Sequence, residues 1–149
     1  MNFISKIEKP DSKQKVKTKK YLDSLVKPIG SLGRLEDFAV KLSGITGKMH
    51  NDLFKKAIVV FGADNGVWDE GVTPVPQSVT DIQMRNMVRG VAGVSVLARQ
   101  SNIDLKVVNI GVKQNSNFNG IIDANLMLGT NNIAKEPAMT IATAKKAID

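Results

Sequence analysis

Cysteine is absent from the 149-residue sequence, and this absence excludes disulfides, thiolate metal ligands and thiol nucleophiles together. The longest apolar run, AIVVFGA at 57–63, is far shorter than the roughly 20 residues that a membrane-spanning helix needs. No signal-peptide apolar segment follows the lysine-rich N-terminus. We therefore expect a cytoplasmic protein that does not bind membranes.

Aromatic residues and histidine are also scarce. The sequence has one Trp, one Tyr and one His, and the aromatics are not interleaved with arginine, so base-stacking platforms for nucleic acid are not indicated. His50 stands in a polar stretch without partners at metal-ligand spacing, which favours a surface residue and no metal site. Neither GxGxxG after a strand, nor GxxxxGK[ST], nor GxSxG occurs, and no cofactor is predicted.

The positive charge is concentrated near the N-terminus. The net charge is +7, and residues 1–30 hold eight lysines against three acidic residues, which gives +5 from this segment alone. On a helix these lysines would point to several sides and not form one stripe, so a solvated surface is the favoured interpretation. A basic nucleic-acid-binding domain remains a minor alternative.

Two amphipathic helices are expected in the first third of the chain. Residues 12–26 carry a partial apolar face that includes Val16 and Leu22, and Pro28 and Gly30 follow. From Leu32 to Ile45 apolar residues recur at three- and four-residue steps, and glycines close the run. We expect both apolar faces to pack against other parts of the protein.

The pattern then changes to that of an α/β fold. The runs 57–63 and 105–112 are typical of strands buried on both faces of a parallel sheet. Between them a helix is expected from Ser78, with Asp81 three residues on as in a capping box, divided in two near Gly90. Strand, helix and strand form a βαβ unit.

The remaining segments allow weaker structural predictions. The stretch IIDANLMLG at 121–129 fits either a strand or an irregular connection, and Thr140 is expected to cap a last helix. Ligands of open α/β sheets bind beyond the carboxyl ends of the strands, which directs attention to the loop 62–80. The simpler interpretation of this loop is that Asp64 and Asn65 make local turn hydrogen bonds and the acidic residues face water.

Four linked motifs carry a family resemblance. They are KPIGSLGRLEDFAVKLSGITG at 27–47, VVFGADNGVWDEGVTPVPQSVTDIQM at 59–84, GVSVLARQ at 93–100 and VVNIGV at 107–112. In this order and spacing the chain, from about 21 to 140, resembles the N-terminal half of the nicotinate-nucleotide:dimethylbenzimidazole phosphoribosyltransferases.

The resemblance implies an activity and an architecture. The family moves phosphoribose from nicotinate mononucleotide to 5,6-dimethylbenzimidazole, giving α-ribazole 5′-phosphate and nicotinate during assembly of the cobalamin nucleotide loop. Its fold is a Rossmann-like parallel sheet with a smaller helical domain. The resemblance also implies a homodimer. By this resemblance, residues 1–50 are expected to belong to the helical domain and residues 51–149 to the α/β domain.

The resemblance also implies a wall for the benzimidazole base. The candidate substrate-binding residues, carried over position by position, are Asp64, Asn65, Gly66, Thr73, Val75 and Gln83. Two of them depart from the family pattern, because Asn65 stands where histidine is common and Val75 stands where serine can occur. Both departures bear on the choice of base.

No catalytic residue is predicted within the sequence. In the family the catalytic glutamate lies near the C-terminal end of the polypeptide, and a GEMGIGNT-like segment lies beyond the position of Asp149. Glu36, Glu70 and Glu136 do not match the catalytic position. We therefore expect an inactive N-terminal portion of the enzyme, and a stand-alone, non-catalytic benzimidazole-binding module is the alternative.

Overall fold

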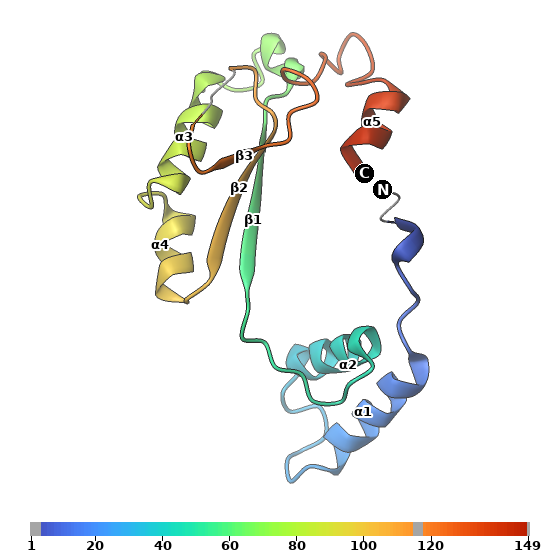
Figure 1. Cartoon of the computed structure of the whole chain (residues 1–149). Coiled ribbons are helices and arrows are strands. Elements are labelled where there is room, and N and C mark those ends of the chain that lie inside the picture. Colours follow the sequence, from blue (N-terminus) through green and yellow to red (C-terminus); the bar gives the residue numbers. More distant parts are fainter. Residues whose placement is uncertain (1–3, 115–117, 149) are drawn as a thin grey trace. The chain divides into compact units, whose positions relative to one another are not determined.

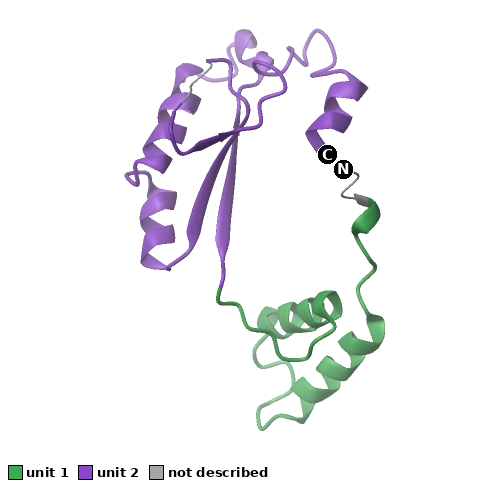
Figure 2. Ribbon diagram, in the orientation of Figure 1, with its two compact units in different colours: residues 1–54 green, residues 55–149 purple. Residues whose placement is uncertain are grey.

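The structure is a computed structural model that describes residues 4–114 and 118–148. It separates into two compact units, residues 1–54 and residues 55–149, which Figure 2 shows in different colours. Each unit is described by itself.

The first unit is a pair of helices preceded by one short turn of helix. Its elements are η1 (Ile4–Lys6), α1 (Ser12–Ser24) and α2 (Arg34–Thr46), so both predicted helices are confirmed. The carboxylate of Asp11 caps α1 by accepting from the backbone N–H of Lys13 and Gln14, and the Asp11 N–H donates to the Gly44 carbonyl at 2.7 Å. A Cβ at Gly44 would lie 2.5 Å from the Lys15 Cε atom, so any larger residue there would displace the Lys15 side chain that packs on this glycine.

The apolar face of α2 is exposed in the described part of the unit, so its packing against other parts of the protein stays a prediction. The side chains buried in α1 and α2 are small or polar, among them Thr18 and Ser43, whereas Leu35 and Phe38 are more than half exposed. The two helices meet through small residues, and this contact turns the apolar stripe of α2 outward. Periodicity identified the stripe correctly, but it could not identify the face that α1 uses.

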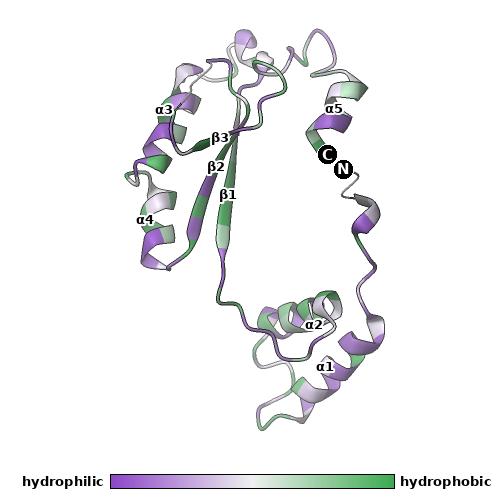
Figure 3. Ribbon diagram, in the orientation of Figure 1, coloured by the Kyte–Doolittle hydropathy of each residue, from purple (hydrophilic) through white to green (hydrophobic). Residues whose placement is uncertain are grey.

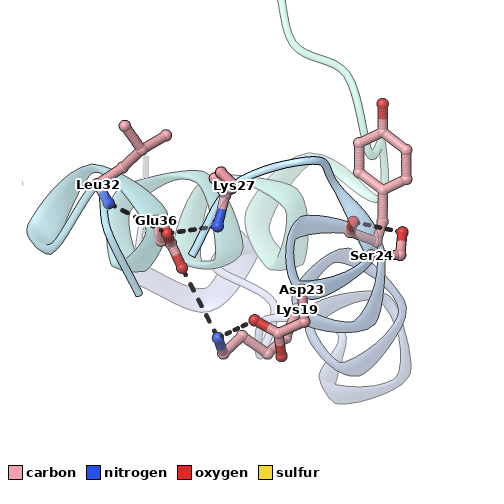
Figure 4. A network of polar contacts seen from close by, with 7 residues as sticks. Lys19, Asp23, Ser24, Lys27, Leu32 and Glu36 are labelled. Atoms are coloured by element: carbon pink, nitrogen blue, oxygen red, sulfur yellow. Dashed lines mark hydrogen bonds and ion pairs between the residues drawn. The ribbon is translucent and has the colours of Figure 1, made fainter. Parts of the chain in front are cut away.

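A buried carboxylate organises the loop between the two helices (Figure 4). Glu36 accepts from the Lys27 ammonium at 2.7 Å and from the Leu32 N–H at 3.3 Å, and the Lys19 ammonium lies 3.7 Å away. The hydrogen bond from Lys27 is the main reason why the pKa of Glu36 is lowered, and the bond from Leu32 acts in the same direction. The pKa of Lys19 is raised, chiefly by its hydrogen bond to Asp23. The loop is thus tied to α2 by charge.

The second unit is an α/β structure, as predicted. Three parallel strands, β1 (Ala57–Ala63), β2 (Asp104–Gly111) and β3 (Ile121–Asp123), lie in the order β1-β2-β3. The connection from β1 to β2 contains η2 (Gly66–Glu70), α3 (Ser78–Val88) and α4 (Gly93–Gln100), and α5 (Ile141–Ile148) follows β3. The predicted division of the middle helix is confirmed, since Gly90 with φ +81° lies between α3 and α4.

The helices α3 and α4 cover one face of this sheet (Figure 1). On that face Met84 and Val107 are 2% exposed and form a core with Val112. A Cβ at Gly62 would lie 2.2 Å from the Met84 sulfur. The absence of a side chain at Gly62 therefore lets Met84 pack directly against the β1 backbone. The register then puts Gly62, Val107 and Ile121 on the same, helix-covered face.

The other face of the sheet, called the bare face below, is largely exposed within residues 4–114 and 118–148, although Val108 on it is buried and lines a shallow cavity together with residues 124–126 and the end of α5. Phe61 is 62% exposed and Ile122 is 51% exposed, and Val59 and Ile110 are also exposed. Figure 3 shows β1 and part of β2 in the green of apolar residues. The prediction that β1 is buried on both faces is therefore wrong for the described chain, because α3 and α4 pack on the opposite face and leave Val59 and Phe61 exposed.

Three smaller predictions have different outcomes. The capping box at Ser78 is wrong, since α3 begins with no side-chain cap and Asp81 instead binds Arg85 at 2.8 Å. Thr140 does cap α5, accepting from the Thr143 N–H at 3.1 Å. The undecided stretch 121–129 begins as the short strand β3 and continues as an irregular connection with bends.

Among the residues that the structure describes, no helix is long and apolar enough to cross a membrane.

Candidate binding site

Buried polar side chains fix the loops at the carboxyl ends of β1 and β2. Asn109 is buried at the end of β2. Its side-chain oxygen Oδ1 accepts from the N–H groups of Gly111 and Val112 at 3.1 and 2.9 Å. Asp64 follows β1 directly, is 4% exposed, and its carboxylate accepts from the Lys113 N–H at 2.8 Å. Because buried polar groups are costly when unpaired, these bonds define the loop geometry at this edge.

The backbone of Asp64 also joins this edge to a later segment. Its N–H donates to the Gly111 carbonyl and its own carbonyl accepts from the Thr130 N–H, each at 2.9 Å. Gly66 adds a contact to the same segment, since its N–H donates to the Thr130 hydroxyl and a Cβ there would lie 2.5 Å from the Thr130 carbonyl oxygen. The start of η2 therefore lies directly against residues 130–132.

An ion pair holds the far end of η2 to the same segment. The Glu70 carboxylate binds the Lys135 ammonium at 2.8 Å and accepts from the Asn132 amide. The hydrogen bond from Lys135 is the main cause of the lowered pKa of Glu70, and the same bond raises the pKa of Lys135. A carboxylate held in this way is a poorer proton acceptor, which agrees with the absence of a catalytic assignment at Glu70.

A pocket of about 410 Å³ opens beside these loops, within the size range of small-molecule sites. One short stretch of sequence, from the end of β1 to the first turns of α3, supplies its lining. Its apolar lining residues are Ala63, Val67, Trp68, Val72, Val75, Pro76 and Val79. Its polar lining residues are Asp64, Asn65, Thr73, Gln77, Thr80 and Gln83.

Two side chains fold the loop 71–77 back onto η2. The indole N–H of Trp68 donates to the Val75 carbonyl at 2.7 Å, and the Gln77 amide donates to the Asn65 carbonyl at 3.2 Å. The Thr73 hydroxyl accepts from the Val75 N–H at 3.2 Å, which stiffens the turn between them. The pocket wall is thus closed by bonds between side chains and backbone of the same segment.

The structure brings together most of the residues that the sequence singled out. Asp64, Asn65, Thr73, Val75 and Gln83 all line the pocket, whereas Gly66 does not and packs against residues 130–132 instead. The suggestion that the acidic residues of the loop all face water is wrong for Asp64, which is buried. Whether these residues bind a substrate stays a prediction.

Sequence reasoning missed the residues that shape the pocket without carrying charge. Trp68 and Gln77 were not selected, although they supply both bonds that fold the loop back. One signal was available for Trp68, because it is the single tryptophan of the chain and lies inside the loop that was already suspected. No comparable signal marked Gln77.

The arrangement is suited to binding a small molecule with apolar surface. Apolar side chains form about half of the pocket lining and polar side chains the rest, and this mixture is typical of small-molecule sites. No group of three or more metal-ligating side chains gathers anywhere in residues 4–114 and 118–148. The exposed His50 packs edge-on against the Tyr21 ring at 5.3 Å in the first unit.

Comparison with known proteins identifies the family of the chain. A family model described as "Phosphoribosyltransferase" matches residues 7–149. The chain is 46% identical over 143 residues to the nicotinate-nucleotide–dimethylbenzimidazole phosphoribosyltransferase of Clostridium perfringens strain 13, covering 96% of this chain and 40% of the relative. It is 44% identical to the protein of the same name from Ruminiclostridium cellulolyticum, covering 98% of this chain and 42% of the relative.

A solved structure gives the same result. The crystal structure of the nicotinate-nucleotide-dimethylbenzimidazole phosphoribosyltransferase from Thermus thermophilus matches with a TM-score of 0.82 and 33% identity, over 91% of this chain and 42% of that chain. The chain thus spans about 40% of the length of the relatives that it matches. Sequence and fold together place the chain in the phosphoribosyltransferase family to which these enzymes belong.

Proposed function

We propose that the chain is a part of an enzyme that transfers phosphoribose from nicotinate mononucleotide to 5,6-dimethylbenzimidazole, and that it supplies the wall that binds the benzimidazole. A ring nitrogen of the base would attack the anomeric carbon of the nucleotide, nicotinate would leave, and the proton on the other ring nitrogen would pass to a carboxylate. The products would be nicotinate and α-ribazole 5′-phosphate.

The pocket at the carboxyl end of β1 is the observation that carries this proposal. Its apolar lining suits a flat hydrocarbon ring system, and a parallel sheet commonly presents its ligands at this edge. Asp64, Asn65, Thr73, Val75 and Gln83 are the proposed contacts of the base. The apolar Val75 side chain favours a methylated base over a hydroxylated one.

The catalytic carboxylate is not proposed among the described residues. Glu36 is engaged by Lys27 within the first unit and Glu70 is engaged by Lys135, so neither is free to accept a proton from the base. We therefore expect no turnover by this chain alone. Nicotinate release from nicotinate mononucleotide and dimethylbenzimidazole measures this directly, and catalytic release at a steady rate would contradict the proposal.

A non-catalytic benzimidazole-binding module is the second candidate function. One observation favours it, since all lining residues of the pocket come from the continuous stretch 63–83. Neither candidate predicts turnover by this chain alone, so isothermal titration with dimethylbenzimidazole distinguishes them by affinity: a self-sufficient module binds tightly, and a wall that lacks the rest of its pocket binds weakly. The absence of heat at millimolar base would count against the module.

Assembly and location are proposed on the family resemblance. We propose a cytoplasmic protein with a Rossmann-like sheet, in which residues 1–50 belong to a smaller helical domain, and a homodimeric enzyme. Light scattering coupled to gel filtration measures the dimer. A nucleic-acid partner is not proposed, and DNA affinity that falls steeply with salt and disappears on deletion of residues 1–20 would restore that alternative.

A further inference from the structure

We propose that Trp68 is the residue by which the pocket recognises a fused aromatic base, acting as a stacking surface for the ring and as the clamp that holds the loop carrying Val75. This inference rests on the proposed function, since it concerns the same pocket. It adds a residue and a physical criterion for choosing the base.

The hydrogen bond of the indole makes Trp68 a clamp. Its N–H donates to the Val75 carbonyl at 2.7 Å, seven residues along the chain, so the ring is held against the returning loop. A bonded indole N–H is no longer available to a ligand. Trp68 therefore offers the pocket a flat apolar ring and no hydrogen-bond donor.

The exposure of Trp68 agrees with a stacking role. The side chain lines the pocket and is 37% exposed, so part of its large apolar surface faces the cavity and not a protein core. Val75, on the loop that the indole holds, lines the same pocket. A planar molecule that entered would bury apolar surface of both residues.

The expected ligand is consequently defined by its shape. A benzimidazole has a flat second ring that can stack on the indole, whereas 4,5,6,7-tetrahydrobenzimidazole has the same two nitrogens but a puckered, non-aromatic second ring. The pocket should prefer the benzimidazole. Aromatic stacking is worth about 0.5–1.5 kcal/mol, so the preference should be about two- to twelvefold.

The experiment uses the chain as it is and needs no external label. Trp68 is the single tryptophan, so the intrinsic fluorescence of the chain reports on this pocket wall. We expect 5,6-dimethylbenzimidazole to quench this emission saturably, with the same dissociation constant as isothermal titration gives. Both probes are compared at alkaline pH, where neither carries a charge.

Three variants separate stacking from a merely structural role. Trp68→Leu should lose the preference for benzimidazole over its tetrahydro analogue, because the flat ring is gone. Trp68→Phe should keep the preference, although it lacks the hydrogen bond to Val75. Phe61→Leu, on the bare face of the sheet, is the matched control and should bind both probes as the unaltered chain does.

The outcomes distinguish this inference from the proposed function. Saturable heat with unchanged Trp68 emission, or a Trp68→Leu variant that weakens both probes equally, would overturn the role of Trp68 and leave base binding intact. No saturable heat with any base would overturn base binding by this chain and the inference together. The fluorescence result holds even if Trp68→Leu fails to fold, because it is measured on the unaltered chain.

Discussion

The two faces of the three-stranded sheet differ in how far their apolar side chains are buried from water. Helices α3 and α4 cover one face and exclude water from Met84 and Val107, while Val59, Phe61 and Ile122 lie exposed on the other face. Both sets of side chains are apolar, so composition alone does not distinguish the faces. The difference shows which contacts support the described fold and which surface is available to further protein.

A parallel sheet normally has both of its faces covered. The relatives of this chain are more than twice as long, and the matched part is about 40% of their length. The bare face thus has the composition of an interior and the exposure of a surface. Changes on the two faces should have very different costs.

The largest effect is expected from Met84→Ala on the covered face. The side chain is 2% exposed and fills the space that Gly62 leaves, so its loss should create a cavity and lower the free energy of unfolding by about 2–5 kcal/mol. Urea unfolding followed by circular dichroism measures this. Met84→Leu keeps most of the volume and should cost less than about 1.5 kcal/mol. Equal losses in the two variants would mean that packing volume is not what matters here.

The next effect is expected where the strands end. Asp64→Ala removes the carboxylate that accepts from the Lys113 N–H, and a hydrogen bond to a charged group contributes about 1.5–3 kcal/mol. The variant should therefore be less stable, and its affinity for dimethylbenzimidazole should fall with the loss of loop geometry. Asp69→Ala, which alters an exposed neighbour in η2, is the control. If Asp69→Ala had the larger effect, the buried carboxylate would not be the anchor of this edge.

The response to pH should sharpen the comparison further, because the packing on the covered face is apolar and the loop of the first unit is tied to α2 by charge. The pKa of Glu36 is lowered below 4.5, mainly by Lys27, so its stabilising effect is complete above pH 4.5 and is lost as the pH falls through the lower native value. The stability difference between the unaltered chain and Glu36→Gln should therefore shrink on acidification. A difference that stays constant from neutral pH to below the native pKa would show that the charge of Glu36 does not stabilise the loop.

The smallest effect is expected on the bare face. Phe61→Ser removes a large aromatic ring, yet the ring is 62% exposed, so the free energy of unfolding should change by no more than about 0.5 kcal/mol. The same change should reduce self-association, which static light scattering measures at rising protein concentration. A loss of stability comparable to that of Met84→Ala would mean that something in this chain covers Phe61.

Local sequence patterns predicted the elements of the fold better than they predicted the partners of those elements. The apolar runs identified β1 and β2, and Thr140 identified the start of α5, because these features depend on neighbouring residues. Whether Phe61 is covered depends on protein that need not be adjacent in sequence. The outward stripe of α2 has the same explanation, since the buried residues Thr18 and Ser43 are polar and gave no apolar signal of the face that packs.

In the candidate site, too, sequence identified some residues, and others became evident only from the folded structure. Family motifs selected Asp64, Asn65 and Val75, which the structure gathers around one pocket. Their selection required a resemblance, because nothing in their spacing indicates a cavity. Trp68 was missed because its contribution lies in a bond to a carbonyl seven residues away, which only the folded loop reveals.

The outer edge of β1 has a consequence for how this site could grow. In the order β1-β2-β3, the strand β1 pairs on one side only, so the backbone groups of its other side can accept one more strand. A strand added there in parallel would finish beside Asp64, which lines the pocket. Enlarging the sheet would then also bring new protein close to the candidate site, through a single set of hydrogen bonds.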